Sequence, residues 1–176
     1  GTLSKFATDV CLYMNQNFGF ISFPKELTTG SSIMPHKQNP DVFELIRAQC
    51  NKIENLPSEL MMITNNLTSG YHRDYQLLKE SVMNAIDTLK DILEVTDFMV
   101  QHIEVKADIL KNPNYDHIYS VEAVNNLVLS GMSFRDAYQK VGSDILEGNF
   151  EPYRKKLNHT HEGSMGNLCL EEIRKK

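Results

Sequence analysis

The stretch LKESVMNAIDTLKDILEVTDFMVQHI, residues 78–103, carries the longest apolar pattern in the chain. Its apolar and small residues return every three or four positions, which is the spacing of one face of an α-helix. This face comprises Leu78, Val82, Ala85, Ile86, Leu89, Leu93, Thr96, Met99, Val100 and Ile103. A helix of this length exceeds the globular mean of about 11–12 residues and needs long partners. The pattern therefore predicts an all-α fold, a long-helix bundle followed by a small C-terminal helical domain.

Shorter helical patterns lie on the N-terminal side of this stretch. The first places apolar residues on one face over residues 3–14, at Leu3, Phe6, Ala7, Val10, Cys11 and Met14. A second helix is expected to begin at Pro40, with Asn39 as its N-cap and Asp41 and Glu44 near the positive end of the helix dipole. We expect this helix to reach about Asn66 and to be kinked at Pro57.

The pattern changes after residues 112–114, Asn-Pro-Asn. A short helix is expected from Ser120 to about Ser130, stopped at Gly131. Another is expected to be capped by Ser133 and to end near Gly148. We place a domain boundary near residues 104–116, so that residues 1–105 form part of a central helical bundle and residues 106–176 a small helical domain.

Composition excludes several classes of partner. The formal net charge is -5 and no dense Lys/Arg block occurs, which argues against a nucleic-acid or anionic membrane surface. No apolar run approaches the roughly 20 residues that span a bilayer, and residues 1–20 do not follow the pattern of a signal peptide. We expect a soluble cytoplasmic protein that binds small molecules or protein. Because the chain lacks an initiator Met and a helical pattern is already under way at Leu3, we also expect it to be cut from a longer protein.

The cysteines and histidines suggest no metal. The three cysteines are far apart and form no Cys-x-x-Cys pair, so neither a disulfide framework nor a zinc site is indicated. The spacings in the tail fit no standard zinc ligand set, although it carries His159, His161, Glu162 and Cys169. We therefore expect no metal and no cofactor.

Residues 24–39 interrupt the helical patterns. Small and polar residues fill 28–32, and Pro35 and Pro40 prevent regular helix hydrogen bonding, so a loop is predicted. Within it, residues 30–40, GSSIMPHKQNP, resemble the Gly-Ser-Ser-x-Met-Pro-x-Lys-x-Asn-Pro pattern of the fumarase/aspartase superfamily. Residues 24–39 are called the serine loop below.

The chemistry of this superfamily is elimination next to a carboxylate, which needs a base for a weakly acidic C–H proton and groups that hold the resulting negative charge. The resemblance assigns proton abstraction to Ser31 and contact with the carboxylate that ends in fumarate to Lys37. A free serine is too weak a base, but backbone N–H groups near Gly30 and a nearby lysine favour its oxyanion.

Other positions in the loop have competing interpretations. Asn39 is either the helix N-cap or a hydrogen-bond donor to substrate, and Ser32 is either a turn residue or a supporting substrate contact. A lone loop lysine is usually a solvated surface residue, and the surrounding motif is what favours a function for Lys37. The variable positions His36 and Gln38 receive no role.

A second motif selects a family within the superfamily. Residues 71–79, YHRDYQLLK, resemble the Tyr-x-Arg-Asp-x-Gln-x-x-Lys pattern of the argininosuccinate lyases, and residues 121–142 resemble the last small helical domain of that family. The resemblance implies that Tyr71, Gln76 and Lys79 surround the arginine-bearing end of argininosuccinate. Their alternative interpretation is a polar helix start with an exposed lysine. One departure is Leu77-Leu78, where the family commonly carries acidic residues.

The resemblance implies a lyase that cleaves argininosuccinate to arginine and fumarate by β-elimination, in arginine biosynthesis. It also implies a homotetramer whose active sites combine several subunits, with a catalytic histidine from a segment N-terminal to this one. The chain is then the C-terminal portion of the enzyme and inactive alone. Two alternatives stay open: another fumarate-releasing lyase such as adenylosuccinate lyase, and a non-catalytic, crystallin-like helical protein.

Overall fold

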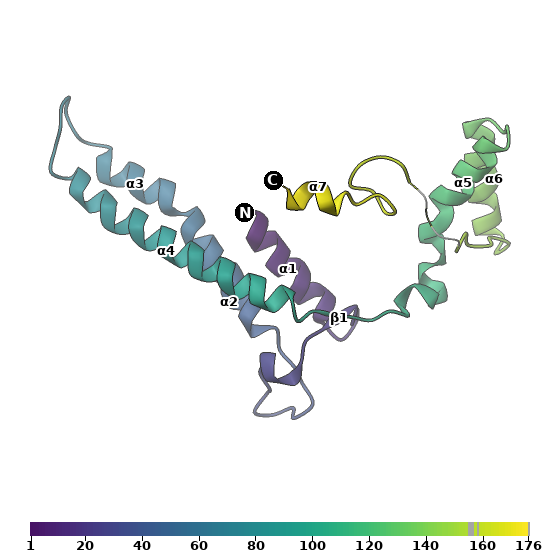
Figure 1. The fold of residues 1–176 in the computed structure, drawn as a ribbon, viewed down its shortest axis with the longest axis horizontal. Helices are drawn as coiled ribbons and strands as arrows, with labels where there is room; N and C mark the ends of the chain where they lie inside the picture. The colour runs from purple at the N-terminus through teal and green to yellow at the C-terminus, as the bar shows by residue number, and fades with distance from the viewer. Residues whose placement is uncertain (155–156, 158, 176) are drawn as a thin grey trace. The chain divides into compact units, whose positions relative to one another are not determined.

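The computed structural model describes residues 1–154, 157 and 159–175, and the chain divides into two compact units, Gly1–Ala107 and Asp108–Lys176. Helices make up most of both units (Figure 1). The predicted helical fold class is confirmed, with one small two-stranded sheet that the sequence did not predict. Among the described residues, no helix is both long enough and apolar enough to cross a membrane.

The first unit is built on the packing of α1, Thr2–Met14, against α2, Asp41–Glu54. Ala7 and Val10 form the buried face of α1, as the sequence pattern predicted. Phe43 of α2 is fully buried, and its ring lies 5.4 Å from that of Phe23 between centroids. This aromatic contact ties the start of the serine loop to the helix that follows it.

The predicted helix over residues 40–66 is two helices, α2 and α3, with α3 running Leu56–Thr64. They meet at Asn55, two residues before the kink predicted at Pro57, because proline has no N–H to continue the helical hydrogen bonds. The predicted N-cap was wrong by one residue. Pro40 occupies the cap position, and its carbonyl accepts hydrogen bonds from the backbone N–H groups of Phe43 and Glu44, at 2.9 and 3.1 Å.

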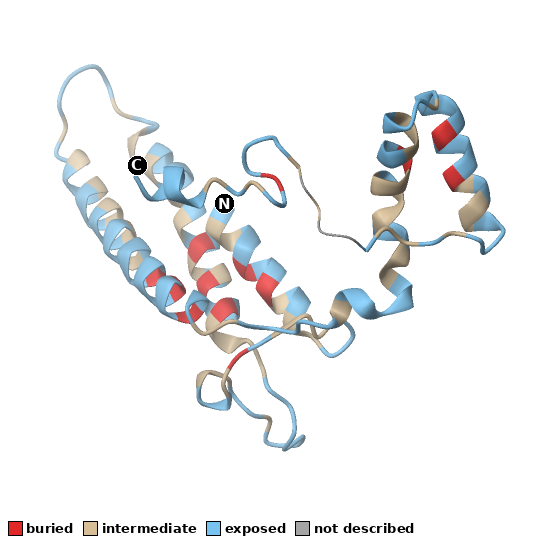
Figure 2. Cartoon of the chain, turned by 45° about the vertical axis from the view of Figure 1, so that its right-hand side comes forward, coloured by how far each residue is buried: buried red, intermediate tan, exposed pale blue. Residues whose placement is uncertain are grey.

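Helix α4, Tyr75–Val100, follows α3 and packs along α3 and α2 (Figure 1). Its length agrees with the predicted stripe, but its buried residues are only Ile92, Thr96 and Met99, in its C-terminal half (Figure 2). The sequence predicts that this stripe needs partner helices, and within this unit it has them along only part of its length. Ile86 and Leu93 are 44% and 51% exposed, because within this unit α2 and α3 cover only one side of the helix.

The two-stranded sheet pairs β1, Ile21–Ser22, with β2, Glu104–Val105, in antiparallel order. Ser22 Oγ donates a hydrogen bond to Glu104 Oε2 at 3.2 Å, and the Lys106 N–H donates to the Phe20 carbonyl at 3.0 Å. This pairing fixes the segment that enters the serine loop against the end of α4. A 3-10 turn, η1 at Lys25–Leu27, follows within the loop.

The described residues of the second unit form the 3-10 segments η2 Ile109–Lys111 and η3 Pro113–Tyr119 and the helices α5 Ser120–Leu129, α6 Phe134–Leu146 and α7 Leu170–Arg174. Its small core consists of Val124, Ala137 and Val141. As predicted, α5 stops before Gly131, whose φ of +103° favours glycine, and Ser133 caps α6. Whether the two units are the predicted bundle part and C-terminal domain of a larger enzyme stays a prediction.

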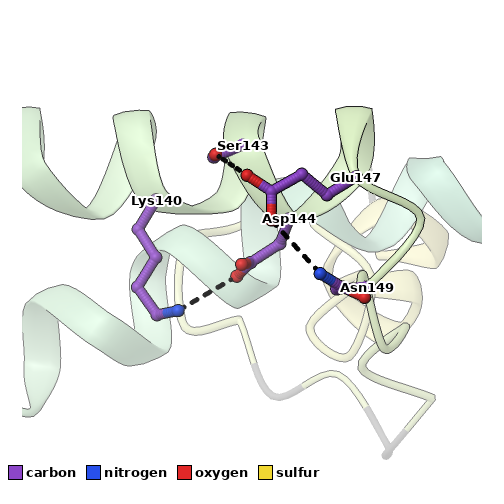
Figure 3. Close-up of polar contacts among 5 residues, drawn as sticks. All are labelled: Lys140, Ser143, Asp144, Glu147 and Asn149. Atoms are coloured by element: carbon purple, nitrogen blue, oxygen red, sulfur yellow. Dashed lines mark hydrogen bonds and ion pairs between the residues drawn. The ribbon is translucent and has the colours of Figure 1, made fainter.

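The C-terminal end of α6 is held by side-chain contacts (Figure 3). Lys140 pairs with Asp144 one turn later at 3.2 Å. The Ser143 hydroxyl donates to one oxygen of Glu147 at 2.8 Å, and the Asn149 amide donates to the other at 3.2 Å. Asn149 also donates its backbone N–H to the Asp144 carbonyl at 2.7 Å. These bonds direct the chain back toward α5.

Candidate functional site

The serine loop is closed at its base by an antiparallel bridge between Thr29 and Asn39. The Asn39 N–H donates to the Thr29 carbonyl at 2.9 Å, and the Thr29 N–H donates in return at 3.4 Å. The Asn39 side-chain amide reaches the Gly30 carbonyl at 3.4 Å instead of capping α2. In this structure Asn39 therefore holds the two ends of the motif together.

The Ser31 hydroxyl lies at the centre of a tight turn in this loop. Its Oγ accepts hydrogen bonds from the backbone N–H groups of Ile33 and Met34, at 3.2 and 3.1 Å. Two N–H dipoles aimed at one oxygen favour negative charge on it, which is what a serine needs in order to act as a base. The same contacts also serve the turn, and Ser31 is half-buried while Ser32 and Ile33 are exposed.

Lys37 lies in a hollow of about 500 Å³ between the serine loop, the end of α1 and the first turn of α2. Ser31 is not among the residues that line it. The lining residues are Cys11, Met14, Asn15, Gln16, Ile21, Ser22, Met34, His36, Lys37, Gln38, Asn39, Pro40 and Glu44. The side chain of Lys37 is exposed, so the hollow is open to solvent at its cationic side.

Two other residues of this hollow bear on its chemistry. The sequence indicates Glu44 only as an acidic residue of the first helical turn, yet it lies on the same hollow as Lys37. The sequence does carry a signal for this placement of Glu44. Residues four apart share a helix face, and Pro40, four residues before Glu44, also lines the hollow. Burial raises the pKa of the Cys11 thiol, with Arg47 opposing and Glu44 adding to the shift. Cys11 is thus a protonated thiol at neutral pH and a poor nucleophile.

Tyr71, Gln76 and Lys79 form one hydrogen-bonded chain. The Gln76 amide nitrogen donates to the Tyr71 hydroxyl, and Lys79 Nζ donates to the Gln76 amide oxygen at 3.0 Å. Gln76 thus uses both ends of its amide, while the Tyr71 hydroxyl keeps its own hydrogen and Lys79 keeps further N–H donors. All three side chains are exposed, Tyr71 by 71%. They present donors to solvent at the N-terminal end of α4.

The two groups of predicted site residues lie at opposite ends of the first unit. The serine loop precedes α2, whereas Tyr71, Gln76 and Lys79 stand where α3 connects to α4, and both views show these places far apart (Figures 1 and 2). Helix α4 alone has 26 residues, which at about 1.5 Å per residue is on the order of 40 Å. One copy of the unit does not bring these residues together around one small molecule.

The tail carries its histidines in a different setting. His159 Nε2 lies 2.9 Å from Glu122 Oε1, and the rings of His159 and His161 are stacked with centroids 5.9 Å apart. Across residues 1–154, 157 and 159–175, no three His, Cys, Asp or Glu side chains are placed to hold a metal ion.

Known proteins that are similar to this chain are lyases. Residues 1–54 match a protein family described as Lyase. The chain is similar to an argininosuccinate lyase of Bacteroides fragilis, 56% identical over 173 residues, which are 98% of this chain and 38% of that enzyme. The enzyme of the same name from Bacteroides thetaiotaomicron is 56% identical over 98% of this chain and 39% of its own length. That from Thermotoga neapolitana is 40% identical over 79% of this chain and 35% of its own length. The chain thus spans less than two fifths of the length of these curated relatives.

Two solved structures resemble the fold. One is a fumarate lyase:delta crystallin from Brucella melitensis bound to cobalt, with a TM-score of 0.65 and 21% identity over 83% of this chain and 32% of that chain. The other is a 3-carboxy-cis,cis-muconate lactonizing enzyme from Pseudomonas putida, with a TM-score of 0.63 and 21% identity over 84% of this chain and 34% of that chain. At this identity the likeness concerns the fold alone. The sequence relatives confirm the resemblance to the argininosuccinate lyases that the motifs at residues 30–40 and 71–79 indicate.

Proposed function

We propose, because this chain belongs to the argininosuccinate lyase family, that the full-length protein cleaves argininosuccinate to arginine and fumarate by β-elimination. The observation that carries the proposal is the geometry of Ser31, whose oxygen accepts two backbone N–H groups within the motif that the resemblance assigns to the base. We assign the elimination to this chain because it supplies both a base, Ser31, and a cation, Lys37.

The proposed reaction starts with transfer of a C–H proton from the succinyl part of the substrate to Ser31 Oγ. The N–H groups of Ile33 and Met34 stabilise the serine oxyanion before this transfer. Lys37 offsets the negative charge that collects on the adjacent carboxylate. The C–N bond then breaks and the electron pair leaves with nitrogen, which takes a proton as arginine forms; we assign this proton to the catalytic histidine that the resemblance implies in a segment N-terminal to this one. Ser32 and Asn39 are proposed to bind the same end of the substrate.

The other end of the substrate is assigned to the chain of Tyr71, Gln76 and Lys79. Its free donors suit a polar, carboxylate-bearing group such as the arginine portion, and Gln76 orients its two neighbours. Because this group and the serine loop lie at opposite ends of the first unit, we propose that each site takes them from different copies. A homotetramer in the full-length protein meets this requirement.

The surface of the first unit supports association between copies. Ile86, Leu89 and Leu93 on α4 remain 40–51% exposed, and apolar side chains that lack a partner favour burial against another helix. We further propose that the substrate is the only small molecule required, with no cofactor, and that the enzyme acts in arginine biosynthesis in the cytoplasm.

The test of the proposed function uses the full-length protein and follows fumarate release by absorbance. Wild-type protein is expected to cleave argininosuccinate and to leave adenylosuccinate intact. Ser31→Ala is expected to abolish turnover while substrate still binds, because the hydroxyl removes a proton and contributes little ground-state affinity. Ile33→Ala is the matched control, since it keeps the backbone N–H that faces Ser31. Turnover by Ser31→Ala near the wild-type rate would remove Ser31 as the base.

A further inference from the structure

The loop between α3 and α4, residues 65–74, carries Tyr71 just before the first turn of α4. The two helices that it joins are bonded to each other, since the Ser81 hydroxyl of α4 donates to Glu59 Oε1 of α3 at 2.5 Å. The loop turns at Gly70, whose φ of +115° is in the region that favours glycine. Tyr71 follows this turn and is 71% exposed, so its direction depends on what holds the loop backbone.

His72 bonds back across this turn with its side chain. Its Nε2 lies 3.0 Å from the Thr68 carbonyl oxygen and 3.4 Å from the Thr68 hydroxyl. Because a carbonyl oxygen only accepts, Nε2 carries a hydrogen and donates it. A protonated imidazole donates from the same atom, so the contact does not depend on the charge of the ring. His72 is half-buried, and its contact closes residues 68–72 around Gly70.

The backbone of His72 takes part in the start of α4. Its carbonyl accepts the Tyr75 N–H at 3.3 Å, and the next carbonyl, of Arg73, accepts the Gln76 N–H at 2.9 Å. Tyr71 reaches the same helical turn, since its hydroxyl accepts from the Gln76 amide and its ring lies 5.8 Å from that of Tyr75 between centroids. His72 therefore connects the loop before Tyr71 to the helical turn that Tyr71 contacts.

We propose that His72 is a positioning residue for Tyr71 in substrate binding. The inference rests on the proposed function, in which Tyr71, Gln76 and Lys79 bind the arginine-bearing end of argininosuccinate. The contact between His72 and Thr68 limits the conformations of the turn, so the Tyr71 hydroxyl stays beside the Gln76 amide before substrate arrives. A binding group that is ordered in advance loses less conformational entropy when the ligand binds, and the ligand binds more tightly.

The first test measures steady-state kinetics of argininosuccinate cleavage by the full-length protein. His72→Ala is expected to raise KM about threefold to tenfold, the range for one hydrogen bond, and to change kcat by less than about twofold. The reason is that Tyr71 contacts an end of the substrate that does not react, so its contacts are the same in the bound substrate and in the transition state. His72→Gln, whose amide nitrogen replaces Nε2 as the donor, is expected to restore most of the wild-type KM.

A double-mutant cycle distinguishes action through Tyr71 from a general loss of structure. Tyr71→Phe removes the hydroxyl that His72 is proposed to position. If His72 acts through this hydroxyl, adding His72→Ala to Tyr71→Phe raises KM by less than about twofold further. Two effects that multiply would overturn the proposal, since they would show that His72 and the Tyr71 hydroxyl act independently.

Hydrogen exchange of the unliganded full-length protein gives a readout that needs no catalytic activity. His72→Ala is expected to speed exchange of residues 68–76 about threefold to tenfold, and His72→Gln to restore it. The matched control is His102→Ala, because His102 Nδ1 donates to the Phe98 carbonyl, also four residues earlier, at 2.7 Å at the other end of α4. This control is expected to leave both KM and the exchange of residues 68–76 unchanged.

Unchanged exchange of residues 68–76 in His72→Ala would overturn the proposal. If instead the wild-type protein does not cleave argininosuccinate, the proposed function fails, and the exchange result still decides whether His72 holds the loop.

Discussion

At the scale of single residues, the serine loop and the start of α4 place their polar groups by different means. Ser31 Oγ is set by backbone N–H groups three or fewer residues away, so a short motif carries its own geometry. Gln76 depends on side chains, because its amide joins Tyr71 to Lys79. A substitution of Gln76 should therefore disturb two neighbours, whereas the neighbours of Ser31 can change without disturbing it.

We predict that Gln76→Ala in the full-length protein weakens binding of the transition state by about 1–3 kcal/mol and thereby lowers kcat/KM for argininosuccinate. This is the usual cost when one polar group buried by the substrate is left without a partner. Lys79→Met is expected to act in the same direction. Gln101→Ala is a suitable control, since Gln101 lies at the other end of α4 and its side-chain amide donates to Asp97 of that helix at 3.0 Å. Steady-state kinetics measure the effect, and unchanged kcat/KM in both variants would contradict a role for this group in substrate binding.

At the scale of elements, the N-terminal ends of α6 and α2 differ in whether the residue next to the helix caps it. Ser133 caps α6 as its sequence predicted, because its Oγ accepts the Asp136 N–H three residues later at 3.2 Å and Gly131 allows the preceding turn. Asn39 has the same capping potential before α2, yet its side chain bonds to Gly30 across the loop. A partner nine residues away thus outweighed the local cap.

This contrast gives a prediction for α6. Ser133→Ala should destabilise the first turn of this helix by about 1 kcal/mol, since one N–H loses its acceptor. Hydrogen exchange of the full-length protein should then become about fivefold faster for residues 134–141. Ser143→Ala serves as the comparison, because the Ser143 hydroxyl donates to the exposed Glu147 at 2.8 Å, near the other end of the helix. Equal exchange in the two variants would show that the cap does not hold this turn.

At the scale of the whole molecule, the two groups of proposed site residues lie at opposite ends of the first unit, and helix α4 alone is on the order of 40 Å long. The apolar residues of α4 that α2 and α3 leave exposed indicate where other helices pack. We therefore propose that the active sites form between copies of the full-length chain.

Mixed assemblies test this arrangement. Full-length Ser31→Ala subunits are expected to be inactive alone and Gln76→Ala subunits weakly active, and activity is expected to rise when the two are unfolded and refolded together. Some sites then take an intact serine loop from one copy and an intact Gln76 from another. The control mixes the Ser31→Ala single variant with a double variant that carries both Ser31→Ala and Lys37→Met, because no combination of these subunits restores the serine. If the first mixture stays as inactive as its parts, the two groups do not serve a shared site.

The sequence by itself determined the features that depend on neighbours along the chain. Helical periodicity, Ser133 and Gly131 defined α1, α5 and α6 closely, and the two motifs pointed to the family that the relatives then confirmed. The tertiary structure decided what depends on distant partners: the β1–β2 pairing across 82 residues, the bond from Asn39 to Gly30, and which side of α4 is buried. An apolar stripe shows that a helix face seeks a partner, but only the packing shows that α2 and α3 cover one side of it and leave Ile86 and Leu93 exposed.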